Sequence, residues 1–310
     1  MKKTLLLCLA LLIISLTSIN LFAPGLLFNA AQDATRTAAG LGVKQITAGE
    51  YQYTYADNGK MDKPVLLMIH GFTADKDNWS RMAVFLKSDY RLIAIDLLGH
   101  GQSPREISAD YAISSQVQRV KEFADALGLE QFHMAGNSMG GHIAAMYAAK
   151  HPEQILSAIL FDNAGVVQPT PSDMLVALEK KEPHPLIIRS TEDVDKFFNF
   201  VFTDPPFMTS SIKQFYAEQS IPLAPLYEKI FADFHANPDE QLEPLLPTIK
   251  APVYIIWGRE DRVLDVSSIE TMKPLLKHAQ ITILDDVGHL PMLERPSQSA
   301  QLVHQFIQGL

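Results

Sequence analysis

The chain has 310 residues, 47% of them hydrophobic, and a formal net charge of −9. This length and composition allow one large α/β domain with a substantial core. The acidic balance argues against nucleic acid as a partner, because no surplus of Lys and Arg is available to neutralise phosphates. The single cysteine, Cys8, lies in the N-terminal apolar run, so the folded part has no thiol for a disulfide, a nucleophile or a Cys-based metal site.

The first predicted element is a membrane anchor. Lys2 and Lys3 precede an apolar run over residues 5–28, and a helix of that length rises about 36 Å, enough to cross a hydrocarbon core of about 30 Å. Pro24-Gly25 is expected to kink or end this helix near the far interface. The lysines should stay in the cytoplasm, which places the catalytic part outside it, on the periplasmic side if the protein is bacterial.

A cleaved signal peptide is the alternative for the same segment. Residues 5–16 alone would fit the shorter apolar region of a signal, and the protein would then be secreted. However, no Ala-x-Ala cleavage pattern occurs before Gly40, and the apolar run continues well beyond residue 16. We therefore favour the anchor.

After residue 43, short β-rich runs alternate with amphipathic helical patterns. An edge strand is predicted at 51–55, followed by turn chemistry at 57–59. This alternation predicts a mostly parallel sheet flanked by helices on both faces. The predicted buried strands are 65–69, 91–95, 132–135, 156–161, 253–257 and 280–284, and the predicted helices are 78–86, 114–127, 140–150, 269–276 and 297–307.

Residues 166–247 break the alternation. They contain no clear β run, are crowded with prolines and hold short helical patterns at 193–202, 211–218 and 226–234. Because the sheet pattern resumes afterwards, we interpret them as an inserted helical cap, with a second independent domain as the alternative. The predicted organisation is an anchor and linker over 1–40, a core over 41–165, the cap or lid over 166–247 and the rest of the core over 248–310.

The central motif is Gly-x-Ser-x-Gly at residues 136–140, between a predicted strand and a predicted helix. A nucleophile on such a sharp turn needs strained backbone angles, and the positions two residues away must lack side chains. The turn also places Ser138 at a helix N-terminus, which favours negative charge. Ser138 is therefore the candidate nucleophile, and an ordinary turn serine is the alternative.

A serine hydroxyl needs a base, and the base needs a carboxylate that fixes its tautomer. His289 lies just after the last predicted strand, and Asp261 lies in the turn after strand 253–257. The chain order Ser, acid, His is the one that a nucleophile elbow on an α/β sheet uses. Asp162, after strand 156–161, is the main rival to Asp261. Weaker rivals are Asp265 and Asp286 for the acid, and His133, His142, His151, His278 and His304 for the base.

Acyl transfer also requires donors for the developing oxyanion. The backbone N–H of Met139, directly after the nucleophile, is one candidate, and that of Phe72, in the loop after strand 65–69, is the other. His70 in that loop is interpreted as a structural turn histidine. We see no residue cluster with metal-ligand spacing and expect neither a metal nor a cofactor.

These motifs together resemble the α/β-hydrolase superfamily over roughly residues 45–165 and 248–310. Residues 71–79 and 255–267 are similar to the abhydrolase-domain monoacylglycerol lipases, which also carry an N-terminal anchor. Bacterial membrane-anchored lipases and phospholipases A have a similar build. The segments that carry the resemblance are His70-Gly71-Phe72, Asp96-Leu97-Leu98-Gly99-His100-Gly101-Gln102-Ser103, the Ser138 turn, Trp257-Gly258-x-x-Asp261 and Gly288-His289.

The resemblance implies a lipid ester substrate, such as a monoacylglycerol, a lysophospholipid or a shorter ester. Epoxide hydrolases and haloalkane dehalogenases of the superfamily carry a carboxylate at the turn, so Ser138 disfavours their chemistry. The alternatives are another serine-dependent reaction (C–C bond hydrolysis, peptide cleavage or perhydrolysis) and a non-catalytic ligand-binding protein on the same fold. The sequence leaves the acyl length, the head group and the oligomeric state open.

Overall fold

The computed structural model describes residue 18 and residues 20–310, and its centre is an eight-stranded sheet. The strand order is β1-β2-β4-β3-β5-β6-β7-β8. β2 pairs antiparallel with β1 and with β4, and all the other neighbours pair parallel. The strands are β1 Gly42–Ala48, β2 Tyr51–Asp57, β3 Val65–Ile69, β4 Arg91–Ile95, β5 Phe132–Asn137, β6 Ile155–Phe161, β7 Val253–Gly258 and β8 Gln280–Leu284.

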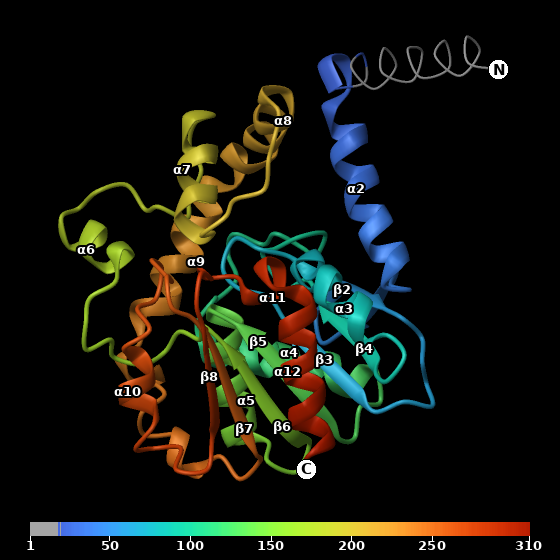
Figure 1. Cartoon of the computed structure of the whole chain (residues 1–310), viewed down its shortest axis with the longest axis vertical. Coiled ribbons are helices and arrows are strands. Elements are labelled where there is room, and N and C mark those ends of the chain that lie inside the picture. The colour runs from blue at the N-terminus through green and yellow to red at the C-terminus, as the bar shows by residue number, and fades with distance from the viewer. Residues whose placement is uncertain (1–17, 19) are drawn as a thin grey trace.

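The central strands are short apolar runs because helices cover both faces of the sheet. α4 (Ile113–Ala126) and α5 (Met139–Lys150) pack together on one face, and α3 (Ser80–Leu86) and α12 (Pro296–Gln308) pack together on the other (Figure 1). The predicted α/β-hydrolase architecture is therefore confirmed. Shorter elements are η1 Lys76–Trp79, η3 Pro238–Glu240, η4 Leu246–Thr248, α10 Ser268–Met272 and α11 Pro291–Glu294.

Two elements of the core differ from the sequence prediction. β1 was not predicted, because six of its seven residues are exposed or only half-buried and the strand has no apolar alternation. It is held instead by pairing with β2, from Gly42 opposite Asp57 to Ala48 opposite Tyr51. The helix predicted over 269–276 is shorter, because α10 ends at Met272, two residues before Pro274, which has no N–H to continue the helical hydrogen bonds.

Between β6 and β7 the chain forms four helices above the carboxyl ends of the parallel strands (Figure 1). Side chains cap two of them, because Ser172 accepts from the N–H of Leu175 and Thr209 accepts from the N–H of Ile212. The first helix was not predicted and the other three lie where the apolar periodicity placed them. These helices are α6 Asp173–Glu179, α7 Glu192–Val201, α8 Ser210–Ser220 and α9 Ala224–Ala236, with η2 Ile221–Leu223 between the last two.

The N-terminal helix α2 (Pro24–Ala38) projects beside these cap helices (Figure 1). Ala23 is not helical and Pro24 begins α2, in agreement with a break at Pro24-Gly25. Most of the predicted anchor, residues 1–17 and 19, lies outside the described residues. Within the part of the chain that the structure describes, no helix is long and apolar enough to cross a membrane.

Candidate active site

Ser138 lies on a strained turn between β5 and α5. Its φ of 56° and ψ of −121° lie in a region of backbone angles that residues other than glycine rarely adopt, and it forms the N-cap of α5. A Cβ on Gly136 would come within 2.1 Å of the carbonyl oxygen of Gly140, and a Cβ on Gly140 within 2.3 Å of that of Ile69. The two glycines are therefore required sterically, because the turn folds back onto itself and onto β3.

His289 lies in the loop between β8 and α11, and hydrogen bonds hold both sides of it. Its N–H donates to the carbonyl of Val201 at 3.0 Å, and its own carbonyl accepts from the side-chain amide of Asn137 at 3.1 Å. Because Asn137 directly precedes Ser138, the second bond ties the histidine loop to the nucleophile turn. His289 is only 4% exposed.

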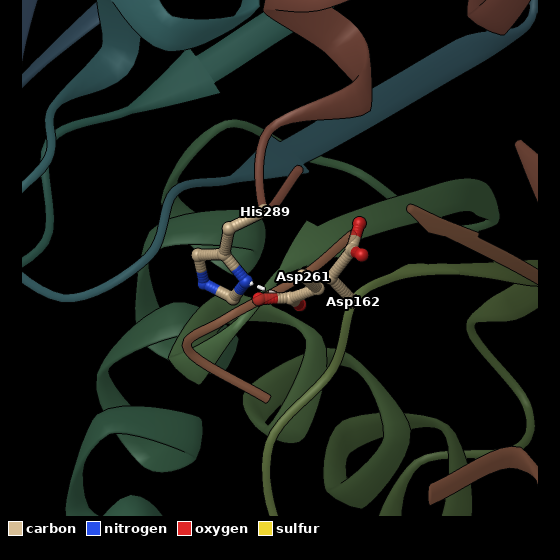
Figure 2. A group of neighbouring side chains, drawn as sticks. All are labelled: Asp162, Asp261 and His289. Carbon is tan, nitrogen blue, oxygen red and sulfur yellow. Dashed lines mark hydrogen bonds and ion pairs between the residues drawn. The ribbon is translucent and has the colours of Figure 1, made fainter. Parts of the chain in front are cut away.

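Asp261 lies in the loop after β7 and faces His289, as Figure 2 shows. Its Oδ2 lies 2.7 Å from Nδ1 of the imidazole, and its Oδ1 accepts from the N–H groups of Val263 at 2.8 Å and Leu264 at 3.0 Å. The two loops touch directly, because a Cβ on Gly258 would come within 2.0 Å of the carbonyl oxygen of Gly288. This arrangement leaves Nε2 of His289 as the nitrogen that could take a proton.

Asp162, the rival acid, is fully buried at the end of β6, beside Asp261 (Figure 2). Its Oδ1 accepts from the N–H of Gly258 at 2.8 Å, and no described residue gives its Oδ2 a hydrogen bond. The hydrogen bond to the imidazole therefore belongs to Asp261. The sequence favoured Asp261 and kept Asp162 as its rival, because both carboxyl groups follow neighbouring parallel strands.

The loop after β3 closes the other side of the nucleophile. A Cβ on Gly71 would lie 3.0 Å from the Cβ of Ser138, so the backbone of this loop passes next to the hydroxyl. Among the described residues, the N–H groups of Phe72 and Met139 make no hydrogen bond with protein atoms. Both predicted oxyanion donors are therefore available to a ligand.

His70 fixes this loop. Its Nε2 accepts from the N–H of Leu97 at 3.0 Å, and its Nδ1 lies 2.7 Å from the carbonyl of Gly71, to which it donates. Burial lowers the pKa of His70 to about 4, so the ring stays neutral. Other histidines are bound elsewhere: His142 contacts the carbonyl of Glu240, and His133 contacts Ser157.

Ser138 and His289 line one open cavity of about 630 Å³. No hydrogen bond joins the two side chains within the described part of the chain, and such bonds are often loose before substrate binds. The wall of the cavity is mainly apolar on the side of the cap, where it consists of Leu186, Phe197, Phe198, Val201, Phe202, Pro206, Phe207, Met208, Ile212, Phe215, Tyr216 and Gln219.

The opposite wall comes from α2, which the sequence analysis assigned to the anchor and linker. Leu27, Phe28, Asn29, Ala31, Gln32 and Thr35 all line the cavity. Phe28 packs against Phe215 and Tyr216 of α8, with ring centroids 5.7 and 6.0 Å apart. Phe28, Ala31 and Thr35 are three and four residues apart, the spacing of residues on one face of a helix.

The lower end of α2 is fixed by charge. Arg36 forms an ion pair with Asp77, which follows the loop of Phe72 and also lines the cavity. Both side chains of this pair are largely buried. The wall formed by α2 is therefore attached to the same segment that carries a predicted oxyanion donor.

The comparison with protein families decides the class of the chain. A model described as the alpha/beta hydrolase fold matches residues 64–296. The chain belongs to the α/β-hydrolase fold family. The resemblance that the motifs predicted is therefore confirmed.

Similar members of the family are lipases. The monoacylglycerol lipase abhd6-A of Xenopus laevis is 36% identical over 288 residues, which make up 89% of this chain and 85% of that relative. Lipase 1 of Psychrobacter immobilis is 36% identical over 269 residues, or 86% of this chain and 84% of the relative. A solved structure of a membrane phospholipase A, described as a bacterial virulence factor, is 41% identical with a TM-score of 0.88 and covers 99% of this chain and 98% of its own. These relatives confirm the predicted ester-hydrolase class.

Proposed function

We propose that the protein hydrolyses carboxylic esters of lipids through a Ser138–His289–Asp261 triad and an acyl-enzyme. The observation that carries this proposal is the position of a strained serine turn and a buried His289–Asp261 pair on one cavity with a mainly apolar cap wall. The names of the lipase relatives support the lipid substrate.

In the first step, Ser138 attacks the ester carbonyl while Nε2 of His289 takes the hydroxyl proton. The N–H groups of Phe72 and Met139 stabilise the oxyanion, and the protonated imidazole then gives its proton to the leaving alcohol. In the second step, a water molecule loses a proton to His289 and attacks the acyl-enzyme. This attack releases the fatty acid and restores Ser138.

We propose that residues 166–247 act as the cap and that the aromatic wall they share with α2 takes the acyl chain. An acyl chain needs a long apolar surface, and the ring pairs Phe197–Phe198 and Phe198–Phe202 provide it. The head group would then lie towards the polar lining formed by Thr73, Asp75 and Asn78.

We also keep the proposal that the chain is held at a membrane by its N-terminal segment, with the catalytic part outside the cytoplasm. The name of the membrane phospholipase A supports the association. Large exposed apolar side chains also occur at the upper end of α2 and on the cap, where Phe22 is 86% and Phe207 92% exposed. N-terminal sequencing of the protein in the membrane fraction tests this, and a start beyond residue 20 would mean a cleaved signal.

The test of the activity is ester hydrolysis by detergent-purified full-length protein, wild type against Ser138→Ala. We expect the variant to lose about 10⁴-fold or more in kcat on p-nitrophenyl esters and on monoacylglycerol and lysophospholipid panels. Ser108→Ala, which changes an exposed serine in a loop, is the matched control and should keep full activity. Hydrolysis that is equal in wild type and Ser138→Ala would exclude the proposed mechanism.

A further inference from the structure

The structure places a second buried carboxyl group beside the pair that activates Ser138. Asp162 is 0% exposed, directly follows β6 and has a positive φ of 42°. One ligand atom from each of Asp162, Asp261 and His289 lies within 4.8 Å of the other two. The ends of two neighbouring strands, β6 and β7, thus bring two carboxyl groups close to one imidazole, and Figure 2 shows that only Asp261 is bonded to it.

The two acids differ in the hydrogen bonds that stabilise a negative charge. Asp261 accepts from two backbone N–H groups and from His289, whereas Asp162 accepts only from the N–H of Gly258. Oδ2 of Asp162 has no partner within the described residues. A buried carboxylate without donors is costly, so the negative charge is placed on Asp261 and the proton on Asp162.

The charged groups that face Asp162 favour the same distribution. Burial raises the pKa of Asp162 well above its ordinary value, and the charge and close side chain of Asp261, followed by the charge of Glu294 of α11, add to the effect. His289 is the group nearby that becomes positive during the reaction. Once the charge of Asp261 is removed, the main repulsive partner is gone and the imidazolium becomes the nearest counter-charge of Asp162.

We propose that Asp162 is a reserve positioning acid, a neutral carboxyl group beside the Asp261–His289 pair that ionises and orients His289 when Asp261 loses its charge. This inference rests on the proposed triad and adds a residue that acts through His289 without touching the substrate. It explains why a buried carboxyl group with an unused oxygen lies at this position, where an amide or a small residue would avoid the desolvation cost.

The test is a double-mutant cycle of Asp162→Asn and Asp261→Asn, measured as kcat/KM on a p-nitrophenyl ester. Asp162→Asn alone should change activity by less than about threefold, because the amide has the shape of the neutral acid and can still accept from Gly258. Loss of the acid in a serine triad costs about 10⁴-fold when nothing replaces it. We expect Asp261→Asn alone to lose only about 10²-fold and the double variant to show the full loss.

Two readouts separate this role from a structural one. The residual activity of Asp261→Asn should rise with pH as Asp162 ionises, and this rise should be absent in the double variant. The low-field proton resonance of His289 Nδ1–H should persist in Asp261→Asn and disappear in the double variant. Thermal unfolding is used to check that the variants are folded. If the amide of Asp261→Asn disturbs the loop, the same comparison is made with Asp261→Ala, with and without Asp162→Asn.

Two results would overturn the inference. One is an Asp261→Asn variant that is folded but no more active than the double variant. The other is an Asp162→Asn variant that is as damaged as Asp261→Asn, since Asp162 would then be a working member of the wild-type site. Failure of the triad itself looks different, because Ser138→Ala would then hydrolyse the ester as well as the wild type does.

Discussion

The loops at the sheet and the walls of the cavity are built in opposite ways. Ser138, Asp261 and His289 are at most 8% exposed and lie on turns fixed by backbone hydrogen bonds and by glycines that no side chain could replace. The walls formed by the cap helices and α2 instead present aromatic side chains to the cavity, and several of these, such as Phe28, Phe197 and Phe198, are only partly buried. We therefore expect the proposed chemistry to depend on a rigid frame, and the choice of substrate to depend on a surface that can change without unfolding the core.

We expect the largest effect from adding a side chain inside the turn of Ser138. Gly140→Ala would place a Cβ 2.3 Å from the carbonyl oxygen of Ile69, so the nucleophile turn must shift, and we expect kcat to fall by about 100-fold or more on every ester tested. Gly42→Ala, where the nearest atom would be 3.8 Å away, is the control and should behave as wild type. Equal activity of the two variants would show that the turn is not rigid.

Acidic pH should lower the free energy of unfolding, because the buried histidines take up protons only when the chain unfolds. Their folded pKa values lie below the unfolded value of about 6.5, so the unfolded state binds more protons and stability falls as pH drops from about 6.5 towards 4. Over this range, each such histidine lowers the free energy of unfolding by roughly 1.4 kcal/mol for each unit that the pH falls. Burial lowers the pKa to about 3 for His100 and to about 4 for His70, His133, His142 and His184.

Three carboxyl groups act in the opposite direction. The pKa of Asp75 is raised to about 7 by burial and by Asp96, and burial also raises the pKa values of Asp162 and Glu294, so their folded forms take up protons as pH falls. The five histidines outnumber these three acids, and four of the five histidines belong to the core. Urea unfolding should therefore give a lower free energy of unfolding at pH 4.5 than at pH 6.5. A higher value at pH 4.5 would contradict this balance.

A change in the cap should alter selectivity and leave the chemistry intact. Phe198 lines the cavity and contacts Phe197, Phe202 and Tyr216, so Phe198→Ala removes a large part of the apolar wall. We expect kcat/KM to fall about 10-fold for long-chain esters and much less for short-chain esters. Phe85→Ala on α3 is the control, because Phe85 is 52% exposed and is not among the residues that line the cavity. An equal loss for all chain lengths would argue against an acyl-binding wall.

The smallest effect is expected where α2 is attached. Arg36→Gln removes the ion pair with Asp77 and loosens the wall, which should raise KM for long-chain esters by two- to fivefold, or about 0.4 to 1 kcal/mol, with little change in kcat. Lys121→Gln removes an exposed pair with Asp125 on α4, remote from the cavity, and should leave KM unchanged. A fall in kcat for Arg36→Gln would instead connect α2 to the chemistry.

The sequence by itself determined most of the sheet, the Gly-x-Ser-x-Gly turn of Ser138 and the ester-hydrolase class. Short apolar runs such as 65–69 and 253–257 are typical of strands in a sheet that is covered on both faces. The turn can be recognised because steric constraints require glycine two positions before and two positions after Ser138. These signals come from residues that are close together in the chain, so they can be recognised without knowing which distant segments pack against them.

Only the tertiary structure decided which acid faces His289 and which helix closes the cavity. Asp162 and Asp261 follow adjacent strands, so the sequence favours Asp261 but leaves Asp162 as a rival, and in the structure His289 and the N–H of Val263 both bond to Asp261. α2 becomes a wall because Phe28 meets Phe215, nearly two hundred residues away along the chain. Contacts of this kind depend on how segments far apart in the chain pack together, and no local pattern of residues predicts them.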